Sequence, residues 1–367
     1  MTKIKDIVEH LEGIAPLQLQ ESYDNSGLLI GNENETISNI LVSLDCTEEV
    51  IDEAVSKNCN LVISHHPIIF KGLKKIIGKN YVERTVIKSI RKNIAIYAIH
   101  TNLDNVLNNG VNSKIAQKLG LKNIDILKKT ESELAKLVTY VPKEYVEQVR
   151  NALFAAGTGN IGNYDYCSFS SEGEGTFRGN ENSKPFAGQK GKLHFESEIK
   201  LETIFPYYLK NKIIKILLNA HPYEEVAYDI FLMQNQWNQV GSGITGFFEK
   251  EINKTNFLNL IKNKMNVEVI KYTEMAKNKI KKVAICGGAG SFLLSDAITA
   301  EADAFITSDF KYHEFFDAEN RILVCDIGHY ESEQFTSELI IEIIKNKFPN
   351  FAPVLAETKT NPVKYFY

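Results

Sequence analysis

Residues 61–67 of this 367-residue chain read Leu61-Val62-Ile63-Ser64-His65-His66-Pro67. The apolar run, rich in β-branched residues, predicts a buried strand, and Pro67 prevents that strand from continuing as a central one. Adjacent residues on a strand point to opposite faces, so His65 and His66 can share a site only where the strand ends or bends. Because open α/β sheets bind ligands at strand ends, the stretch predicts two metal-binding imidazoles at the mouth of a sheet. The alternative at this point is a pair of solvated histidines in a loop.

The segments around this stretch alternate strands with helices. Apolar runs predict strands over residues 40–44 and 94–100, and helical spacing of apolar residues predicts helices over residues 48–57 and 82–92. The second of these strands ends at His100. Strand-helix-strand units of this kind build parallel sheets with right-handed crossovers.

The C-terminal third repeats this order. Three apolar stretches with polar ends match the strands above: residues 282–287, 304–309 and 322–329. Glu333 lies four residues after His329, just as Asp104 lies four residues after His100. The repeat predicts two α/β half-domains that face each other across a shared site.

The segment between the halves has a different order. Its predicted elements are a strand, a helix, two strands, a helix and a strand, over residues 135–141, 143–156, 164–169, 193–205, 209–218 and 226–232. Residues 170–191 are rich in Gly, Ser and Asn, which predicts a mobile hairpin. The order βαββαβ is the ferredoxin-like pattern.

The predicted fold class is therefore α/β. A duplicated three-layer α/β core is expected from residues 1–128 and 240–367, with an inserted ferredoxin-like (βαββαβ) α+β domain over residues 129–239. The length supports two or three domains. With 44% hydrophobic and 24% charged residues, the composition is that of an ordinary soluble globular protein.

Charge and cysteine content exclude several classes of function. A net charge of −4 disfavours a nucleic-acid backbone as the main partner, because that binding needs a dense basic surface. The N-terminus has no apolar signal core and no apolar run approaches the ~18 residues of a membrane span, so we expect a cytoplasmic protein without membrane attachment. The five cysteines form no C-x-x-C pair, which argues against a disulfide framework and a thiolate zinc site.

The candidate site joins both halves. His329 and Glu333 project from one face if a helix begins there. With His65, His66 and Asp104 they give three imidazoles and two carboxylates, a donor set suited to zinc, manganese or ferrous iron. Five ligands fit two divalent ions, about 3.5 to 4 Å apart as in other two-metal hydrolytic sites, if Glu333 bridges them. The alternative is that Glu333 is an ordinary acid in the first turn of a helix.

Other polar residues have weaker signals. Four are expected to orient the imidazoles or to shuttle protons, with a structural role equally consistent for each: Asp45, His100, Asp309 and His313. Asp24 and Asn25 are either turn formers or a second layer around the site. The motif His221-Pro222-Tyr223-Glu224-Glu225 is interpreted as a loop with a local role, and Cys286-Gly287-Gly288-Ala289-Gly290 is a weak phosphate-binding signal.

These residues resemble the NGG-interacting factor 3-like family, also called GTP cyclohydrolase 1 type 2 homologues. Five motifs carry the resemblance and run in the family's order along the whole chain: Tyr23-Asp24-Asn25-Ser26-Gly27-Leu28, Ser64-His65-His66-Pro67, His100-Thr101-Asn102-Leu103-Asp104, Thr307-Ser308-Asp309-Phe310-Lys311-Tyr312-His313 and Gly328-His329-Tyr330-Glu331-Ser332-Glu333. The family often has Trp at position 23 and Gly at position 308. The inserted segment is similar to that of the longer bacterial members.

The resemblance implies a set of properties for this chain. It implies two divalent metal ions held by the five residues of the candidate site, with Glu333 touching both, and a homohexameric toroid whose sites face an inner cavity. As an enzyme, the protein would use a metal-bound water to open the imidazole ring of GTP or a related nucleotide, with His100 or His313 as catalytic proton shuttle. The alternative is a non-catalytic protein that binds, senses or delivers metal through partners. A nucleic-acid accessory role for such a ring is disfavoured by the charge.

Overall fold

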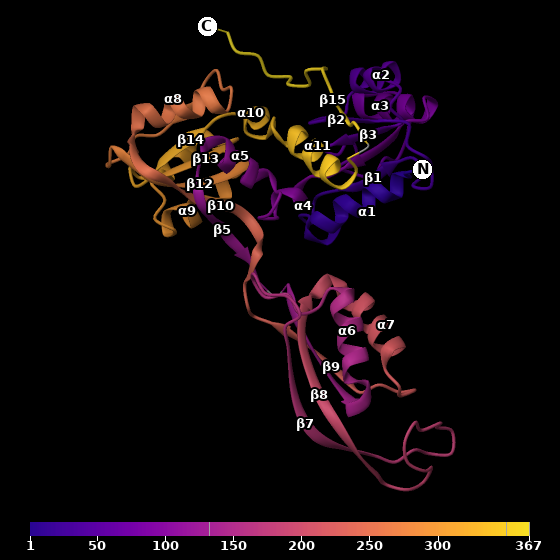
Figure 1. The fold of residues 1–367 in the computed structure, drawn as a ribbon. Helices are drawn as coiled ribbons and strands as arrows, with labels where there is room; N and C mark the ends of the chain where they lie inside the picture. Colours follow the sequence, from indigo (N-terminus) through magenta and orange to yellow (C-terminus); the bar gives the residue numbers. More distant parts are fainter. Residues whose placement is uncertain (132, 350, 367) are drawn as a thin grey trace. The chain divides into compact units, whose positions relative to one another are not determined.

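The computed structural model describes residues 1–131, 133–349 and 351–366 (Figure 1). The chain forms two compact units, one made of Met1–Lys128 with Gln239–Tyr367 and the other of Lys129–Asn238. Among the helices in the described ranges, none combines the length and apolar character that crossing a bilayer requires.

The first sheet is built mainly from the N-terminal half. Its strands, in spatial order, are β1 (Gly27–Ile30), β4 (Ala95–Ala98), β3 (Leu61–Ser64), β2 (Ile40–Ser43) and β15 (Val354–Leu355). Strands β2, β3 and β4 are parallel, whereas β1 is antiparallel to β4. Every residue of the three parallel strands is buried, which requires cover on both faces of the sheet.

Helices supply that cover. They are α1 (Ile4–Ile14), α2 (Glu48–Ser56), α3 (Tyr81–Arg91) and α11 (Thr336–Lys347), and Figure 1 shows α2 and α3 on one side of the sheet with α1 and α11 on the other. Helix α2 begins after its predicted N-cap, because the Thr47 side chain accepts a hydrogen bond from the Val50 N–H. The result for this half is a three-layer arrangement.

The second sheet repeats the first. Its strands, in spatial order, are β11 (Lys271–Tyr272), β14 (Leu323–Asp326), β13 (Ala304–Ser308), β12 (Lys279–Ala289), β10 (Trp237–Asn253) and β5 (Lys122–Thr130). Strands β12, β13 and β14 are parallel and β11 is antiparallel to β14, so β11-β14-β13-β12 reproduces the order β1-β4-β3-β2. Helices that pack on this sheet include α5 (Val111–Leu119), α8 (Lys254–Lys264) and α9 (Leu294–Thr299).

The two halves exchange strands, which sequence patterns did not predict. Strand β15, from the C-terminal end, pairs in parallel with β2 of the first sheet. Strand β5, from the N-terminal half, lies next to β10 in the second sheet. Each half thus completes the sheet of the other, and the duplicated core is one compact unit.

The unit Lys129–Asn238 has its own sheet and core. Its elements are β6 (Leu134–Pro142), α6 (Val146–Ala156), β7 (Ser168–Phe177), β8 (His194–Pro206), α7 (Lys210–Ala220) and β9 (Tyr228–Met233). The strands form an antiparallel sheet in the order β7-β8-β6-β9. Side chains of α6 and α7 pack on this sheet in one apolar cluster that includes Val149, Leu153, Ile213 and Leu217.

Strand β7 differs from its prediction. It was expected over residues 164–169, but it begins at Ser168 and runs to Phe177, into the stretch expected to be a mobile hairpin. Tyr166 has a φ of 55°, a left-handed conformation that a strand cannot include. Within the strand, Gly175 faces the Glu198 carboxylate so closely that a Cβ would lie 2.2 Å from Oε2. Glycine here therefore marks a close approach within a sheet and does not mark a turn.

Candidate metal centre

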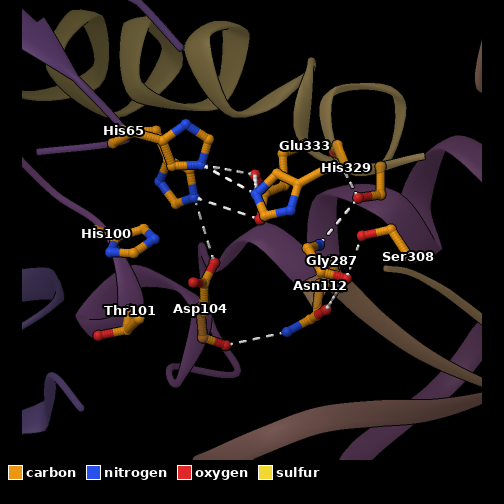
Figure 2. Close-up of polar contacts among 12 residues, drawn as sticks. His65, His100, Thr101, Asp104, Asn112, Gly287, Ser308, His329 and Glu333 are labelled. Carbon is orange, nitrogen blue, oxygen red and sulfur yellow. Dashed lines mark hydrogen bonds and ion pairs between the residues drawn. The ribbon is translucent and has the colours of Figure 1, made fainter. Parts of the chain in front are cut away.

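The two adjacent histidines stand where β3 ends. The Ser64 hydroxyl donates to the His66 carbonyl at 2.8 Å, which closes a tight bend after the strand. The bend turns both rings toward Glu333: the His66 Nε2 lies 2.9 Å from Oε2, and the His65 Nε2 lies 3.9 Å from Oε1. Figure 2 shows His65 and Glu333 in this group. The two neighbouring rings therefore face the same carboxylate where the strand bends.

Helix α10 (His329–Glu333) delivers the second half's contribution. His329 and Glu333 lie on one face, with 3.1 Å between His329 Nε2 and Glu333 Oε2. The same oxygen faces His66, and the two Nε2 atoms of His66 and His329 lie 3.4 Å apart. The Glu333 carboxylate, almost completely buried, therefore has imidazoles of both halves on one oxygen and His65 on the other side.

Asp104 completes the group from the short helix α4 (Thr101–Asp104). Its Oδ1 lies 3.7 Å from the His65 Nε2. The His65 Nδ1–H donates to the Ile99 carbonyl at 2.8 Å, so Nε2 carries the free lone pair. Both Nε2 of His65 and Oδ1 of Asp104 are buried and lack a hydrogen-bond partner in the described part of the chain. A buried polar atom left unpaired costs about 1–3 kcal/mol, and a cation between these two atoms would pair both.

All five predicted ligands therefore lie in one place. Three overlapping groups have ligand atoms within 4.8 Å of one another: His65, His66 and His100; His66, His329 and Glu333; His65, Asp104 and Glu333. Two of the three groups contain Glu333. Apart from His100, the donors are three imidazoles and two carboxylates. This set fits a transition-metal or zinc site.

A second layer fixes the imidazoles. The Nδ1–H of His66 donates to Asp45 at 2.7 Å, and the Nδ1–H of His329 donates to Asp309 at 2.6 Å. These bonds, with the one from His65 to Ile99, direct the Nε2 atom of each ring to the cluster. Asp45 and Asp309, expected at strand ends, have the orienting role proposed for them. Sequence reasoning missed Thr360, whose hydroxyl donates to Asp45 from near the C-terminus.

His100 stands beside the cluster. Its ring centroid lies 5.2 Å from that of His65 and 5.3 Å from that of His66. The Nδ1–H donates to Asp24 at 2.8 Å, and Asp24 also accepts from the backbone N–H and the hydroxyl of Thr101. Of the two roles open for Asp24 in the sequence, the structure supports the second layer around the site.

His313 lies elsewhere. It sits on the 3₁₀ segment Tyr312–Ala318, is exposed, and packs its ring against Tyr312 and Phe316. It is absent from the residues that line the pocket over the cluster. The prediction of His313 as a proton shuttle is not supported, because Asp309, four residues earlier, is the side chain of this segment that reaches the cluster.

The charges of the site favour a bound cation. Burial opposes the imidazolium form of His66, yet hydrogen bonds to Asp45 and Glu333 raise its pKa to about 10. Burial also opposes the imidazolium form of His329, yet hydrogen bonds to Glu333 and Asp309 raise the pKa of its ring to about 9. For Asp104, burial and the Glu333 charge raise the pKa of the carboxyl well above its usual range. These raised pKa values mean that the groups of the site bind protons readily. A metal ion in the same place would supply the positive charge that those protons supply.

The glycine-rich residues 286–290, at the end of β12, leave space for the Glu333 carboxylate. A Cβ on Gly288, which has a φ of 65°, would lie 2.3 Å from Glu333 Oε1. The N–H of Gly288 donates to the Ser332 hydroxyl at 2.9 Å, and that of Gly287 donates to the Asn112 side chain at 2.8 Å. These amides hold protein groups, so the stretch makes room for Glu333 and does not offer the phosphate cradle considered from the sequence.

A duplicated α/β core with histidines and carboxylates gathered between its halves defines a protein with a candidate metal-binding site. The chain belongs to the Duf34/NIF3 (NGG1p interacting factor 3) family, whose profile matches residues 2–362. This agrees with the resemblance found in the motifs.

Individual relatives are similar over their whole length. A Bacillus subtilis protein named GTP cyclohydrolase 1 type 2 homolog is 39% identical over 367 residues, covering 98% of both chains. A Halalkalibacterium halodurans protein of the same name is 37% identical over 364 residues, again covering 98% of each. The crystal structure of a Bacillus cereus protein related to NIF3 superposes with a TM-score of 0.85 at 36% identity, covering 100% of this chain and 99% of that one.

Proposed function

We propose that this protein binds two divalent metal ions and hydrolyses the imidazole ring of a guanine-type substrate. The observation that carries the metal site is the pair of buried, unpaired atoms His65 Nε2 and Asp104 Oδ1, which face each other beside the Glu333 carboxylate. The name shared by the curated relatives supports the reaction class.

Each residue has a role in this proposal. One ion would be held by His65, Asp104 and Glu333, and the other by His66, His329 and Glu333. Divalent ions such as zinc, manganese or iron supply an acidified water and an electrophile to sites of this kind. Asp45 and Asp309 keep the Nε2 atoms of His66 and His329 available for coordination.

His100 is the proposed proton shuttle. Asp24 holds its Nδ1–H, so Nε2 is the atom free to accept a proton from water and return it to a ring nitrogen of the substrate. In the reaction, one water adds to C8 and the C8–N9 bond breaks to leave a formamide. A second water then releases formate and leaves an amine.

The test combines metal content with turnover. Purified protein should contain about two divalent ions per chain. When it is incubated with guanosine or its nucleotides, it should release one formate per ring opened, as measured by chromatography. The His100→Ala variant should keep its metal and lose most turnover, since general acid–base catalysis contributes typically ~10²–10⁴-fold. Metal-loaded protein that releases no formate from any of these compounds would contradict the reaction.

The second candidate is a non-catalytic protein that binds, senses or delivers metal. The observation in its favour is that the protein itself supplies three imidazole and two carboxylate donors, a set that can hold metal ions without any donor from a substrate. Transfer of metal from the loaded protein to a competing chelator, faster with a partner present and without any turnover, would favour this function.

The wider organisation is part of the proposal. We propose the homohexameric toroid and the cytoplasmic location implied by the resemblance, with light scattering as the test of the hexamer. We also assign Lys129–Asn238 to the ferredoxin-like class as an inserted domain. Its element order and its antiparallel strand order β7-β8-β6-β9 support that assignment.

A further inference from the structure

The pocket over the candidate metal ligands has walls that indicate which molecules it accepts. Its volume is about 940 Å³, and residues of both halves line it. Four of the lining side chains are large, aromatic and exposed: Tyr23 at 67%, Phe70 at 47%, Tyr81 at 60% and Phe292 at 59%. Exposed apolar side chains grouped around one pocket mark a binding surface, and aromatic rings stack well on planar heterocycles.

This aromatic wall reaches the candidate ligands. The Phe70 ring packs edge-on against the His100 ring, with 5.7 Å between the centroids. His100 in turn contacts the rings of His65 and His66. A planar ligand lying against Phe70 would therefore have its edge at the candidate metal ligands.

The charge of the pocket is one-sided. Among the described residues that line it there is no Lys and no Arg. Four carboxylates do line it: Glu21, Asp45, Asp104 and Glu333. Asp24 and Asp309 lie directly behind His100 and His329. These six carboxylates outweigh the charge of two divalent ions, so little positive charge remains for a ligand with several phosphates.

The groups near the pocket that could bind phosphate do not line it or are flanked by acidic residues. Lys71, Lys74 and Lys75 follow Phe70 in the sequence but are absent from the lining. Helix α2 starts at the wall beside Thr47, and helix N-termini attract anions. However, Glu48 and Glu49 occupy its first turn and Asp45 precedes it. A triphosphate would meet repulsion there.

Glu21 provides a fixed acceptor at the pocket wall. Its backbone N–H donates to the Thr101 hydroxyl at 2.9 Å, and its Oε1 accepts from the Asn105 amide at 3.2 Å. The carboxylate is thus held in place with one oxygen still to offer a ligand. Carboxylates bind the adjacent N–H groups of a guanine-like edge well, because charge-assisted hydrogen bonds are the stronger ones.

We infer that this pocket takes a planar nitrogen heterocycle without a triphosphate, as a free base or nucleoside, with its ring on the aromatic wall and its N–H edge on Glu21. The inference rests on the proposed function and names the substrate class of the same site.

Binding measurements test it independently of turnover. Equilibrium dialysis of zinc-loaded full-length protein should give a guanosine affinity at least tenfold higher than that for GTP. Phe292→Ala and Glu21→Gln should each weaken guanosine binding roughly tenfold, as expected for loss of a stacking ring or a charged acceptor. Phe231→Ala, which removes an equally exposed ring (57%) in the other unit, is the matched control and should change nothing.

Three outcomes would overturn the inference: GTP binding as tightly as guanosine, competition by inorganic triphosphate, or no guanosine binding at millimolar concentration. Tight guanosine binding without formate release would contradict the proposed reaction and leave the substrate class standing. Tight binding and turnover of GTP would contradict the inferred substrate class and leave the proposed reaction standing.

Discussion

His65 Nε2 and Asp104 Oδ1 lie 3.7 Å apart, both buried and neither with a hydrogen-bond partner in the described residues. Two buried polar atoms left without a partner are costly, and a cation between them would pair both. The folded core should therefore depend on metal for part of its stability.

We predict that chelation lowers the melting temperature of the core. A ligand present at 100 times its Kd stabilises the folded state by about 2.7 kcal/mol, so a shift of several degrees is expected. Calorimetry before and after treatment with a chelator, and after zinc is restored, would measure it. Asp104→Asn should lose the response, while Asp317→Asn, at an exposed acid outside the cluster, should keep it. A melting temperature that does not change when the chelator is added would contradict a metal role for His65 and Asp104.

Replacing His329 should remove metal and leave the fold intact. His329 begins the short helix α10 after the end of β14, and it is not part of the apolar core cluster of this half. His329→Ala should lose at least one ion per chain by elemental analysis, with an unchanged circular dichroism spectrum. His313→Ala is the matched control, because that histidine is exposed and outside the cluster. Global unfolding of the His329 variant would instead show a structural role.

Gly288→Ala should damage the site through Glu333. A Cβ would stand 2.3 Å from Glu333 Oε1, and the positive φ adds strain of about 1–2 kcal/mol. Gly120→Ala is a sharp control, since Gly120 also has a positive φ (78°) but open space at its Cβ position. Both variants should lose stability in urea, and only Gly288→Ala should lose metal. Equal metal content in the two would contradict the clash argument.

The attachment of the C-terminal segment should depend on pH through Glu53. Burial opposes the charged form of Glu53, but hydrogen bonds from Lys57 and Thr358 lower its pKa to about 2. Because the folded pKa lies below the unfolded value of about 4.3, this stabilisation is present above pH ~4.3 and is lost as the pH falls toward 2. The difference in urea midpoint between the native chain and Glu53→Gln should shrink over that range. A constant difference would mean that the charge of Glu53 does not hold the segment.

The unit Lys129–Asn238 should be dispensable for metal binding. None of the five proposed ligands lies in it, and β5 and β10, which lead into and out of it, are neighbours in one sheet. Replacing residues 130–238 by a short Gly/Ser linker therefore joins ends that are already close, at little cost in loop entropy. The shortened protein should fold and hold two ions by elemental analysis. Loss of metal with the fold retained would mean that this unit supports the site.

Much of the core and the metal cluster could be predicted from the sequence, because both depend on local patterns. Apolar runs that end at polar residues define β2, β3, β4, β13 and β14, and the four-residue spacing of His329 and Glu333 places both on one helical face. The bend at Pro67 brings His65 and His66 to a single carboxylate. Each of these features depends on only a few consecutive residues, so it can be predicted directly from the sequence.

Only the tertiary structure decided which distant residues meet. The exchange of β5 and β15 between the halves, the contact of Thr360 with Asp45, and the space that Gly288 leaves for Glu333 join residues far apart in the chain. The tertiary structure also showed which of two histidines that follow predicted strands lies near the site. His100 lies beside the candidate metal ligands, and His313 does not. The physical reason is that spacing along the chain sets the direction of a side chain within its own element, whereas packing between elements sets which side chains face each other across the site.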